Sequence, residues 1–453
     1  MNPGAGLQNI RIFSGISLVL ELSWSEDQDA RPFRYHTQKT KQMFKQPANY
    51  LWIALLLVFG CSQKTTNSGG DAAVQQKANE LAQKYIITDG HVDLPYRLKV
   101  RNFRFTKEYL GIPIETEDGD FDYVRAKEGG LDAPFMSIYI PANKGTGMEA
   151  YKLADSLITM VEGIAKEHPD KFAVATTPDQ VEANFKKGII SLPMGMENGS
   201  PIMDDLKNVA YWHDRGIRYV TLTHSKDNQI CDSSYDDAGT YGGLSDFGRE
   251  VVKEMNRVGI MVDISHVSDN TFWQVMEMTD VPVIASHSSC RKYTPGFERN
   301  MDDDMIKALG ENGGVIQINF GSSFLDIEIR KNNEEKREEL TKMLEDKGLG
   351  FRDDAAQPII EQFRKDNPTL YSDVQMVANH IDHVVKLAGI DHVGLGSDFD
   401  GVGDSLPTGL KDVSQYPNLI AELLRRGYSE EDIAKVCYKN VFRVWRAVEE
   451  AAE

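Results

Sequence analysis

Short apolar runs alternate with helical patterns along most of this sequence, and the alternation limits what the chain can fold into. Each apolar run is nearly continuous, as is typical of a strand buried on both faces of a sheet. The runs lie at residues 85–92, 133–140, 189–196, 218–224, 259–266, 282–287, 314–320 and 392–398. Amphipathic helical patterns such as 244–258 and 302–310 fill most of the intervals. Eight strand–helix units predict an α/β fold, a parallel (β/α)8 TIM barrel, with a doubly wound open sheet as the alternative.

Composition and motif content exclude several kinds of partner. The chain has 50 Lys and Arg against 69 Asp and Glu, a formal net charge of −19, whereas a nucleic-acid-binding surface needs a cationic footprint. No glycine-rich phosphate-binding motif follows any of the eight runs. None of the four cysteines has CxxC spacing, so neither a zinc knuckle nor a disulfide framework is indicated. We therefore expect neither nucleic acid nor a bound nucleotide.

The N-terminal part of the sequence carries a targeting signal. Residues 51–60 are apolar or small, but this stretch is too short for a membrane-spanning helix, which needs about 20 residues. Lys41 and Lys45 precede it, and Cys61 follows Gly60. A basic flank, a short apolar core and a small residue before the cleavage point are typical of a secretory signal. A cysteine at that point resembles a bacterial lipoprotein box, in which the cysteine is lipidated and becomes the mature N-terminus.

These features divide the chain into four segments. Met43 opens a better signal peptide than Met1, so we expect the residues before it to be unstructured or to precede the true start. The expected segments are the upstream stretch 1–42, a lipoprotein-type signal peptide 43–61 ending at the lipidated Cys61, a polar, flexible tether 62–79 and the barrel domain 80–453. We expect an exported lipoprotein, periplasmic or at the cell surface, whose only membrane contact is its lipid anchor. A simple secretory peptide cut nearby is the alternative.

A charged insertion separates the seventh and eighth expected strands. Residues 326–366 are long, highly charged and helical in pattern. Loops that follow strands build the active face of a (β/α)8 barrel. The insertion is therefore either a lid over that face or a solvated helical hairpin.

Histidines gather at the ends of the expected strands. Four of the ten histidines, at positions 91, 224, 266 and 287, lie at or near the carboxyl end of a run. In a barrel all such ends face one side, where catalytic groups collect. His91 and Asp93 are two residues apart, so their side chains point the same way along a strand. An imidazole nitrogen and a carboxylate oxygen placed in this way can bind one divalent metal.

A second metal site is expected around the carboxylate at the end of the third run. Glu197 follows Met-Gly-Met and precedes Asn-Gly, and these small residues allow close approach. A carboxylate has two oxygens and can bridge two cations, although a turn or capping role explains Glu197 equally well on this observation alone. His266 and His287 end the fifth and sixth runs, and neutral imidazoles are typical zinc ligands.

Three further residues are candidates for catalysis and substrate binding. Asp398 ends the eighth run and can take a proton from a metal-bound water and deliver it to a leaving amine. Asp400 competes for this role, and the position favours Asp398. His224 is a further metal ligand or stabilises negative charge on a tetrahedral intermediate. Arg299 follows the sixth run, where its guanidinium suits a substrate carboxylate, although a surface arginine is an equal alternative.

Other reactive residues fit structural roles better. His380 and His383 are three apart inside a helical pattern, 374–387, which is more often a surface or core feature. Cys290 lies close to His287, but no base for a thiol mechanism is evident. No G-x-S-x-G nucleophile motif occurs, which argues against serine catalysis.

The ordered set of motifs resembles the membrane (renal) dipeptidase family over about residues 86–448. The resemblance is carried by Asp-Gly-His-Val-Asp-Leu-Pro (89–95), Gly-Met-Glu-Asn-Gly (195–199), Leu-Thr-His-Ser (222–225), Asp-Ile-Ser-His-Val-Ser (263–268), Ser-His-Ser-Ser (286–289), Arg-Asn (299–300) and Gly-Ser-Asp-Phe-Asp-Gly (396–401). The resemblance implies a barrel of the metal-dependent hydrolase type, two zinc ions, small dipeptide substrates and a possible homodimer. The sequence departs from the renal pattern at Asn198, where the renal enzyme has glycine, and in the insertion 326–366, which is longer than in the mammalian members.

Residue roles follow from the resemblance position by position. It implies that His91 and Asp93 bind one zinc and that His266 and His287 bind the other. Glu197 would bridge the two ions.

In the same resemblance His224 contacts the scissile carbonyl region, and Arg299 holds the substrate carboxylate. Asp398 transfers the proton and anchors the free amine. The expected activity is hydrolysis of dipeptides by a metal-bridging hydroxide. A related amidohydrolase acting on a cyclic amide or lactam and a non-catalytic peptide-binding lipoprotein are the alternatives.

Overall fold

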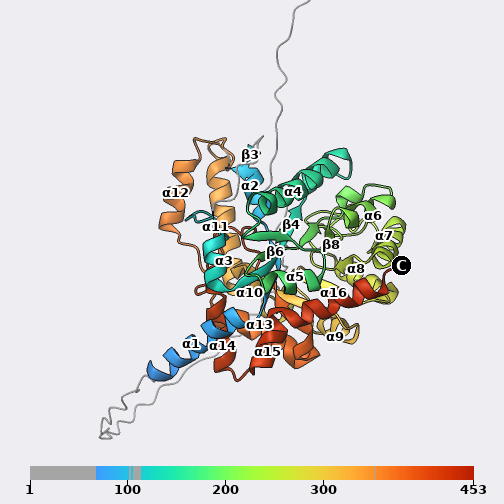
Figure 1. Ribbon diagram of the computed structural model, residues 1–453. Helices are drawn as coiled ribbons and strands as arrows, with labels where there is room; N and C mark the ends of the chain where they lie inside the picture. The colour runs from blue at the N-terminus through green and yellow to red at the C-terminus, as the bar shows by residue number, and fades with distance from the viewer. Residues whose placement is uncertain (1–67, 102–103, 106–113, 352) are drawn as a thin grey trace, which may run out of the picture.

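The computed structural model describes residues 68–101, 104–105, 114–351 and 353–453, and in this part of the chain it confirms the expected barrel (Figure 1). Its main sheet has eight parallel strands, and each strand pairs with the next one along the sheet. In order they are β1 (Ile87–Val92), β4 (Leu131–Tyr139), β7 (Met194–Glu197), β8 (Ile217–Thr221), β9 (Met261–Asp263), β10 (Ile284–Ser288), β11 (Val315–Ile318) and β12 (Val393–Leu395). Each of the eight strands overlaps one of the expected apolar runs.

Contacts between the first and last strands close the barrel. Val92 and Phe399 form a parallel bridge. The backbone N–H of Asp93 donates to the carbonyl of Phe399 at 2.9 Å, and the N–H of Asp398 donates to the carbonyl of His91 at 3.1 Å. Closure therefore brings the carboxyl ends of β1 and β12 together, although about 300 residues of chain separate them.

The third apolar run, 189–196, forms two strands instead of the expected one. Pro193 interrupts it, because proline has no backbone N–H to donate to a neighbouring strand. The residues before it form β6 (Ile190–Leu192), which pairs with β5 (Phe172–Val174) in a separate parallel pair. The residues after it form β7, which lies in the barrel. A second two-stranded pair, which is antiparallel, consists of β2 (Val100–Arg101) and β3 (Arg104–Phe105).

Helices follow the strands and cover the outside of the barrel. Apart from α1 and the helices of the insertion, which are described below, they include α2 (Leu94–Lys99), α3 (Tyr123–Gly129), α4 (Met148–Glu167), α5 (Pro178–Phe185), α6 (Lys207–Asp214), α7 (Asp246–Val258), α8 (Asp269–Met278), α9 (Asp303–Glu311), α13 (Val374–Ala388), α14 (Tyr416–Arg425) and α16 (Asn440–Ala451). The expected helices 244–258 and 302–310 are thus confirmed as α7 and α9. Ser245 caps α7 by accepting the N–H of Gly248, and Gly259 ends it with φ 84°.

Part of the expected tether, residues 62–79, is helical. Helix α1 (Ser68–Lys84) begins inside it and packs against α14, as Figure 1 shows in blue and red. Ala78, Leu81 and Ala82 are buried at helical spacing, and Val74 packs against the same core. The expectation of a flexible segment was therefore wrong from Ser68 onward, because the polar composition concealed this narrow apolar stripe.

The charged insertion is a helical hairpin with a small core of its own. Helix α11 (Ile327–Glu345) and helix α12 (Gln357–Asp366) lie side by side at the edge of the molecule, drawn in orange in Figure 1. A separate cluster of buried apolar residues joins them: Leu340, Leu344, Ala356, Ile360 and Phe363. A short helix, α10 (Ser322–Leu325), connects β11 to the hairpin. The helical pattern expected at 326–366 is confirmed.

The targeting signal lies outside the residues that the structure describes. Residues 1–42, the expected signal peptide 43–61 and its Cys61 all belong to this part of the chain. Within the described residues, no helix has both the length and the apolar character needed to cross a bilayer.

Candidate active site

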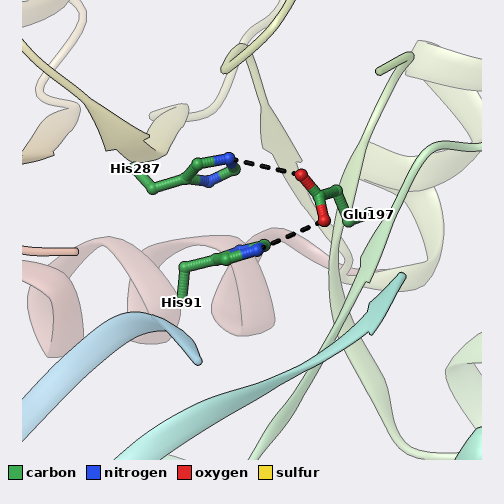
Figure 2. Close-up of side chains that lie close together, drawn as sticks. All are labelled: His91, Glu197 and His287. Carbon is green, nitrogen blue, oxygen red and sulfur yellow. Dashed lines mark ion pairs between the residues drawn. The ribbon is translucent and has the colours of Figure 1, made fainter. Parts of the chain in front are cut away.

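The polar residues expected at strand ends meet at the carboxyl end of the barrel. His91 lies in β1, Glu197 is the last residue of β7, and His287 lies in β10. Figure 2 shows the imidazoles of His91 and His287 pointing together at the Glu197 carboxylate. The two rings are stacked with their centroids 3.8 Å apart. All three side chains are buried, so water screens their charges only weakly.

The two oxygens of Glu197 face different groups of side chains. Oε2 lies 3.3 Å from Nε2 of His91, and that nitrogen is 3.4 Å from Oδ2 of Asp93. Oε1 lies 3.1 Å from Nε2 of His266 and 3.4 Å from Nε2 of His287. From the sequence, the same residues were expected to form two metal sites that share the Glu197 carboxylate. The structure brings all five together and turns one carboxylate oxygen toward each pair.

These residues are suited to binding divalent metal ions, because their donor atoms are of the right kind, lie close together and in part lack hydrogen-bond partners. Three overlapping groups have donor atoms within 4.8 Å of one another: His91–Glu197–His287, Glu197–His224–His266 and His91–Asp93–Asp398. Nε2 of His91 and Oδ1 of Asp93 are buried and have no hydrogen-bond partner in the described part of the chain. Buried polar atoms are normally satisfied, and imidazole and carboxylate are ligands that zinc takes.

Burial and charge favour the deprotonated forms of Glu197, His266 and His287, which a metal requires, but not that of His91. Burial alone would raise the pKa of Glu197, but the imidazoles of His91 and His224 hold it well below its usual range. Burial also lowers the pKa of His266 and of His287 well below the ordinary histidine value. Burial would lower the pKa of His91, but Tyr219, Glu197 and Asp93 raise it well above its ordinary value. A cation would therefore meet neutral nitrogens at His266 and His287 and would displace a proton from His91.

Asp398 and Asp400 follow β12 in one turn but face different partners. Asp398 belongs to one of the three donor groups, and its Oδ2 accepts a hydrogen bond from Nδ2 of Asn319 at 2.8 Å. Oδ2 of Asp400 instead pairs with Nε of Arg97 at 2.9 Å. Burial raises the pKa of Asp398 to about 7. The arrangement places Asp398, which the sequence favoured, in the cluster and Asp400 outside it.

His224 lies beyond the end of β8, next to Glu197. Its Nε2 is 3.5 Å from Oε1 of Glu197, and its ring centroid is 4.8 Å from that of Tyr139 and 4.3 Å from that of His266. Its Nδ1 is buried without a hydrogen-bond partner among the described residues. This position suits both roles expected from the sequence, a further ligand and a contact to a substrate carbonyl.

Arg299 is a buried cation held at the edge of the cluster. Its Nη1 donates to Oγ of Ser288 and its Nη2 to the carbonyl of His287, both at 2.8 Å. Its Nε is buried with no hydrogen-bond partner in the part of the chain described. A buried charge without a counter-ion is costly. The guanidinium is therefore suited to a ligand that brings a carboxylate, and it is not the surface arginine that the sequence left as an alternative.

The insertion packs against the loop that carries Arg299. The guanidinium of Arg299 lies 5.5 Å from the ring centroid of Phe324, and that ring is 5.6 Å from the ring of Phe297. The guanidinium of Arg330 in α11 lies 3.5 Å from the ring centroid of Phe297. Helix α11 is thus linked to Arg299 through two aromatic rings.

Positive φ angles concentrate around the site. Among the described residues, the non-glycine positions with positive φ are Asn198, Met203, His266, Asp398 and Asp400. Such conformations cost about 1–3 kcal/mol each and persist where the surrounding structure enforces them. His266 and Asp398 therefore lie on turns that aim side chains which a continued strand would direct elsewhere.

Asn198, at the departure from the renal pattern, adopts a backbone conformation that suits glycine. Its φ is 78°, which asparagine tolerates better than most residues. Its Nδ2 donates to the carbonyl of Ile140 at 2.9 Å, and its Oδ1 accepts from Nδ2 of Asn228 at 2.9 Å and from Oγ of Ser200. The asparagine thus keeps the turn and ties Glu197 to neighbouring loops.

The histidines that the sequence set aside lie outside the site. His380 is buried in α13, where its Nδ1 accepts from the backbone N–H of Cys290 and its Nε2 bonds the carbonyl of Leu325, both at 3.0 Å. His383 bonds Asp303 at 2.7 Å. Burial raises the pKa of the Cys290 thiol, which disfavours the reactive thiolate.

Four polar residues that contact the site were missed by the sequence reasoning. Asn319 directly follows β11, so the strand-end rule that found the other residues also applies to it. Asp263 and Ser286 belong to motifs already noted, but only their neighbouring histidines were singled out. Tyr219 lies inside β8 among apolar residues, and nothing in the sequence distinguishes it from a core tyrosine.

Comparisons with known proteins agree with this geometry. The family model described as membrane dipeptidase (peptidase family M19) matches residues 75–453. A Schizosaccharomyces pombe protein named an uncharacterized dipeptidase is 30% identical over 388 residues, which cover 83% of this chain and 84% of that protein.

Two solved structures are similar over most of the chain. The probable dipeptidase PvdM of Pseudomonas aeruginosa is 26% identical with a TM-score of 0.71, covering 84% of this chain and 100% of that one. A metallopeptidase of Rhodobacter sphaeroides, liganded with a phosphinate mimic of L-Ala-D-Ala, is 25% identical with a TM-score of 0.64 and covers 80% and 99%.

Proposed function

This chain belongs to the membrane dipeptidase family and is a metallodipeptidase, and from that premise we propose that it hydrolyses small dipeptides with two zinc ions and a hydroxide shared between them. The observation that carries the proposal is that the two carboxylate oxygens of Glu197 face different histidines. Oε2 faces His91, and Oε1 faces His266 and His287. One carboxylate set between two groups of imidazoles supports a bridging role.

His91 and Asp93 would hold one ion, and His266 and His287 the other, with Glu197 between them. Bound zinc would polarise the peptide carbonyl and lower the pKa of water so that hydroxide is available near neutral pH. The protein supplies rigid, buried donors for this purpose, since all five residues are less than one-tenth exposed.

The remaining site residues bind the substrate and move the proton. The Arg299 guanidinium, fixed by Ser288, binds the substrate's C-terminal carboxylate. Asp398 accepts a proton from the attacking water and delivers it to the departing amine, and Asn319 holds one of its oxygens in place. His224 donates to the carbonyl oxygen as negative charge develops there.

The experiment is hydrolysis of a small substrate panel by the purified protein, with total zinc measured on the same sample. The panel includes L-Ala-L-Ala, L-Ala-D-Ala, since a relative was solved with a mimic of that dipeptide, and a neutral cyclic amide. We expect dipeptide cleavage at two zinc ions per chain, lost with a chelator and restored by zinc. Two zinc ions with cleavage of the cyclic amide alone would move the substrate to the rival class. A folded protein that takes up no metal would refute the metal assignment.

Asp398→Asn tests the proton-transfer role separately. We expect turnover to fall by at least about 100-fold, the usual contribution of a positioned acid–base group, while the bound metal is retained. Turnover close to that of the unaltered protein would reject the role.

We propose further that the protein is an exported lipoprotein anchored through Cys61. The basic flank, the short apolar core and Gly60 before the cysteine support this, and these residues lie outside the part of the chain that the structure describes. Mass spectrometry of protein extracted from membranes should find a lipidated N-terminal cysteine. A mature protein that retains a peptide from residues 1–42 would refute the proposal. Sedimentation velocity of the same sample tests the expected homodimer.

A further inference from the structure

The four imidazoles around Glu197 differ in what holds their second ring nitrogen. Nδ1 of His91 lies 2.9 Å from the hydroxyl of Tyr219, and Nδ1 of His287 lies 2.7 Å from Oγ of Ser286. Nδ1 of His224 and of His266 are buried with no hydrogen-bond partner among the described residues. A neutral imidazole binds a metal through the nitrogen that lacks the proton, so the partner of the other nitrogen decides which one is free.

The Tyr219 hydroxyl acts as an acceptor toward His91. Its single hydrogen is directed to the carbonyl of Gly90, 3.0 Å away. A hydroxyl that has donated its hydrogen can only accept from a second neighbour. Nδ1 of His91 therefore carries the proton, and Nε2 presents its lone pair toward Glu197 and Asp93.

The Ser286 hydroxyl acts in the same way on His287. Oγ of Ser286 donates to Oδ2 of Asp263 at 2.6 Å, so it accepts from Nδ1 of His287. Asp263 is fully buried and is itself held as an acceptor. Its Oδ1 takes the backbone N–H groups of Ser265 and Ser286 at 3.1 and 2.8 Å, and its Oδ2 also takes the hydroxyl of Thr221.

The barrel leaves room for the contact between Tyr219 and His91. Tyr219 lies on β8, and β7 and β4 separate that strand from β1 in the sheet. Its ring therefore crosses the barrel interior to reach His91. It passes over Gly195 of β7, where an added Cβ would lie 1.9 Å from Cζ of the ring. Any side chain at position 195 would displace the tyrosine.

We infer that Tyr219 and the Asp263–Ser286 pair are positioning residues that hold His91 and His287 with Nδ1 protonated, so that each ring presents Nε2 to a metal. Tyr219 acts on His91, which faces Oε2 of Glu197, and the Asp263–Ser286 pair acts on His287, which faces Oε1. The inference rests on the proposed metal-binding function of these histidines. It assigns a role to three buried polar residues, Tyr219, Asp263 and Ser286, that a simple core does not require.

The test is zinc affinity in purified single variants, measured by competition with a chromophoric chelator. Tyr219→Phe removes the acceptor of His91, and Ser286→Ala removes that of His287. We expect each variant to release one of its two zinc ions 10–100-fold more readily than the unaltered protein, as is usual when an outer partner of a metal ligand is lost. Activity should fall at limiting zinc and recover with added zinc.

A third variant changes the direction of the hydrogen bonds. In Asp263→Asn, the new amide can donate to Ser286, whose hydroxyl then donates to Nδ1 of His287. The proton of that imidazole would move to Nε2, the nitrogen needed by the metal. We expect Asp263→Asn to weaken zinc binding at least as much as Ser286→Ala, although it keeps the size of the side chain.

Two control variants remove hydroxyls from other places. Tyr428→Phe removes a hydroxyl that bonds Asp382, and Ser191→Ala removes a buried hydroxyl that accepts from Asn184. Both should keep zinc affinity and activity. If Tyr219→Phe and Ser286→Ala also keep the zinc affinity of the unaltered protein, the positioning role is refuted while the metal site stands. If the unaltered protein binds no zinc, the proposed function itself fails. Loss of zinc that excess zinc does not restore would indicate a general structural role and also refute the inference.

Discussion

Gly401 gives a strict test of how closely the carboxylates of the site are packed. A Cβ added at this position would lie 2.1 Å from Oδ1 of Asp398 and 2.2 Å from Oδ2 of Asp93. Contacts of this kind essentially never fall below 3.0 Å. The methyl group of Gly401→Ala must therefore push both carboxylates away by roughly 0.8–0.9 Å, because a packed interior has no free space to absorb it.

The displacement predicts a large effect on activity and a moderate effect on stability. Misplacing catalytic groups by about 1 Å costs about 100-fold in rate, and overpacking a buried position costs about 1–3 kcal/mol. We expect Gly401→Ala to lower kcat/KM for dipeptides by about 100-fold and to weaken the zinc site that contains Asp93. The backbone at Gly401 does not have positive φ, so backbone strain does not contribute.

The assay compares kcat/KM, zinc content and melting temperature in Gly401→Ala and in a matched control, Gly147→Ala. Gly147 has φ −115° and no atom within 4 Å of an added Cβ, so alanine fits there. The control should behave like the unaltered protein. If Gly401→Ala keeps kcat/KM within about threefold of it, the carboxylates are not confined as the distances imply and the reasoning is refuted.

Three further predictions concern binding and stability. Arg299→Ala should raise KM for dipeptides by about 10- to 100-fold, because a charged pair contributes about 1.5–3 kcal/mol; an unchanged KM in steady-state kinetics would reject the carboxylate contact. Arg330→Ala should raise KM by a smaller factor at unchanged kcat, because it loosens the Phe297 loop that carries Arg299; Lys331→Ala, an exposed neighbour, is the control. Burial raises the pKa of Asp132 to about 7, so the folded protein keeps a proton that the unfolded chain loses near pH 4. Asp132 should therefore contribute a fall of up to about 4 kcal/mol in the free energy of unfolding between pH 4 and pH 7. The difference between the unaltered protein and Asp132→Asn in denaturant titrations measures this contribution, and the same pH dependence in both proteins would contradict the burial argument.

The sequence by itself determined the strand order of the barrel and the residues that meet at its rim. Each of the eight strands overlaps one of the apolar runs, because a strand buried on both faces is mostly apolar along its length. His91, Glu197, His287 and Asp398 follow from those runs, since the carboxyl ends of parallel strands in a closed barrel share one face. The resemblance to the membrane dipeptidase family rests on the same motifs and is confirmed by the family match.

The tertiary structure decided the features that depend on contacts between distant segments. It separated Asp398 from Asp400, because Asn319 binds the first carboxylate beside the metal ligands and Arg97 pairs with the second outside them. It formed α1 from an apparently polar segment, because α14 buries its narrow apolar stripe. Likewise, it showed Tyr219 reaching across the barrel to His91 over the space left by Gly195. Local sequence patterns indicate how much of each segment is buried. Which side chain forms a hydrogen bond with a buried imidazole nitrogen depends on contacts that exist only in the closed barrel.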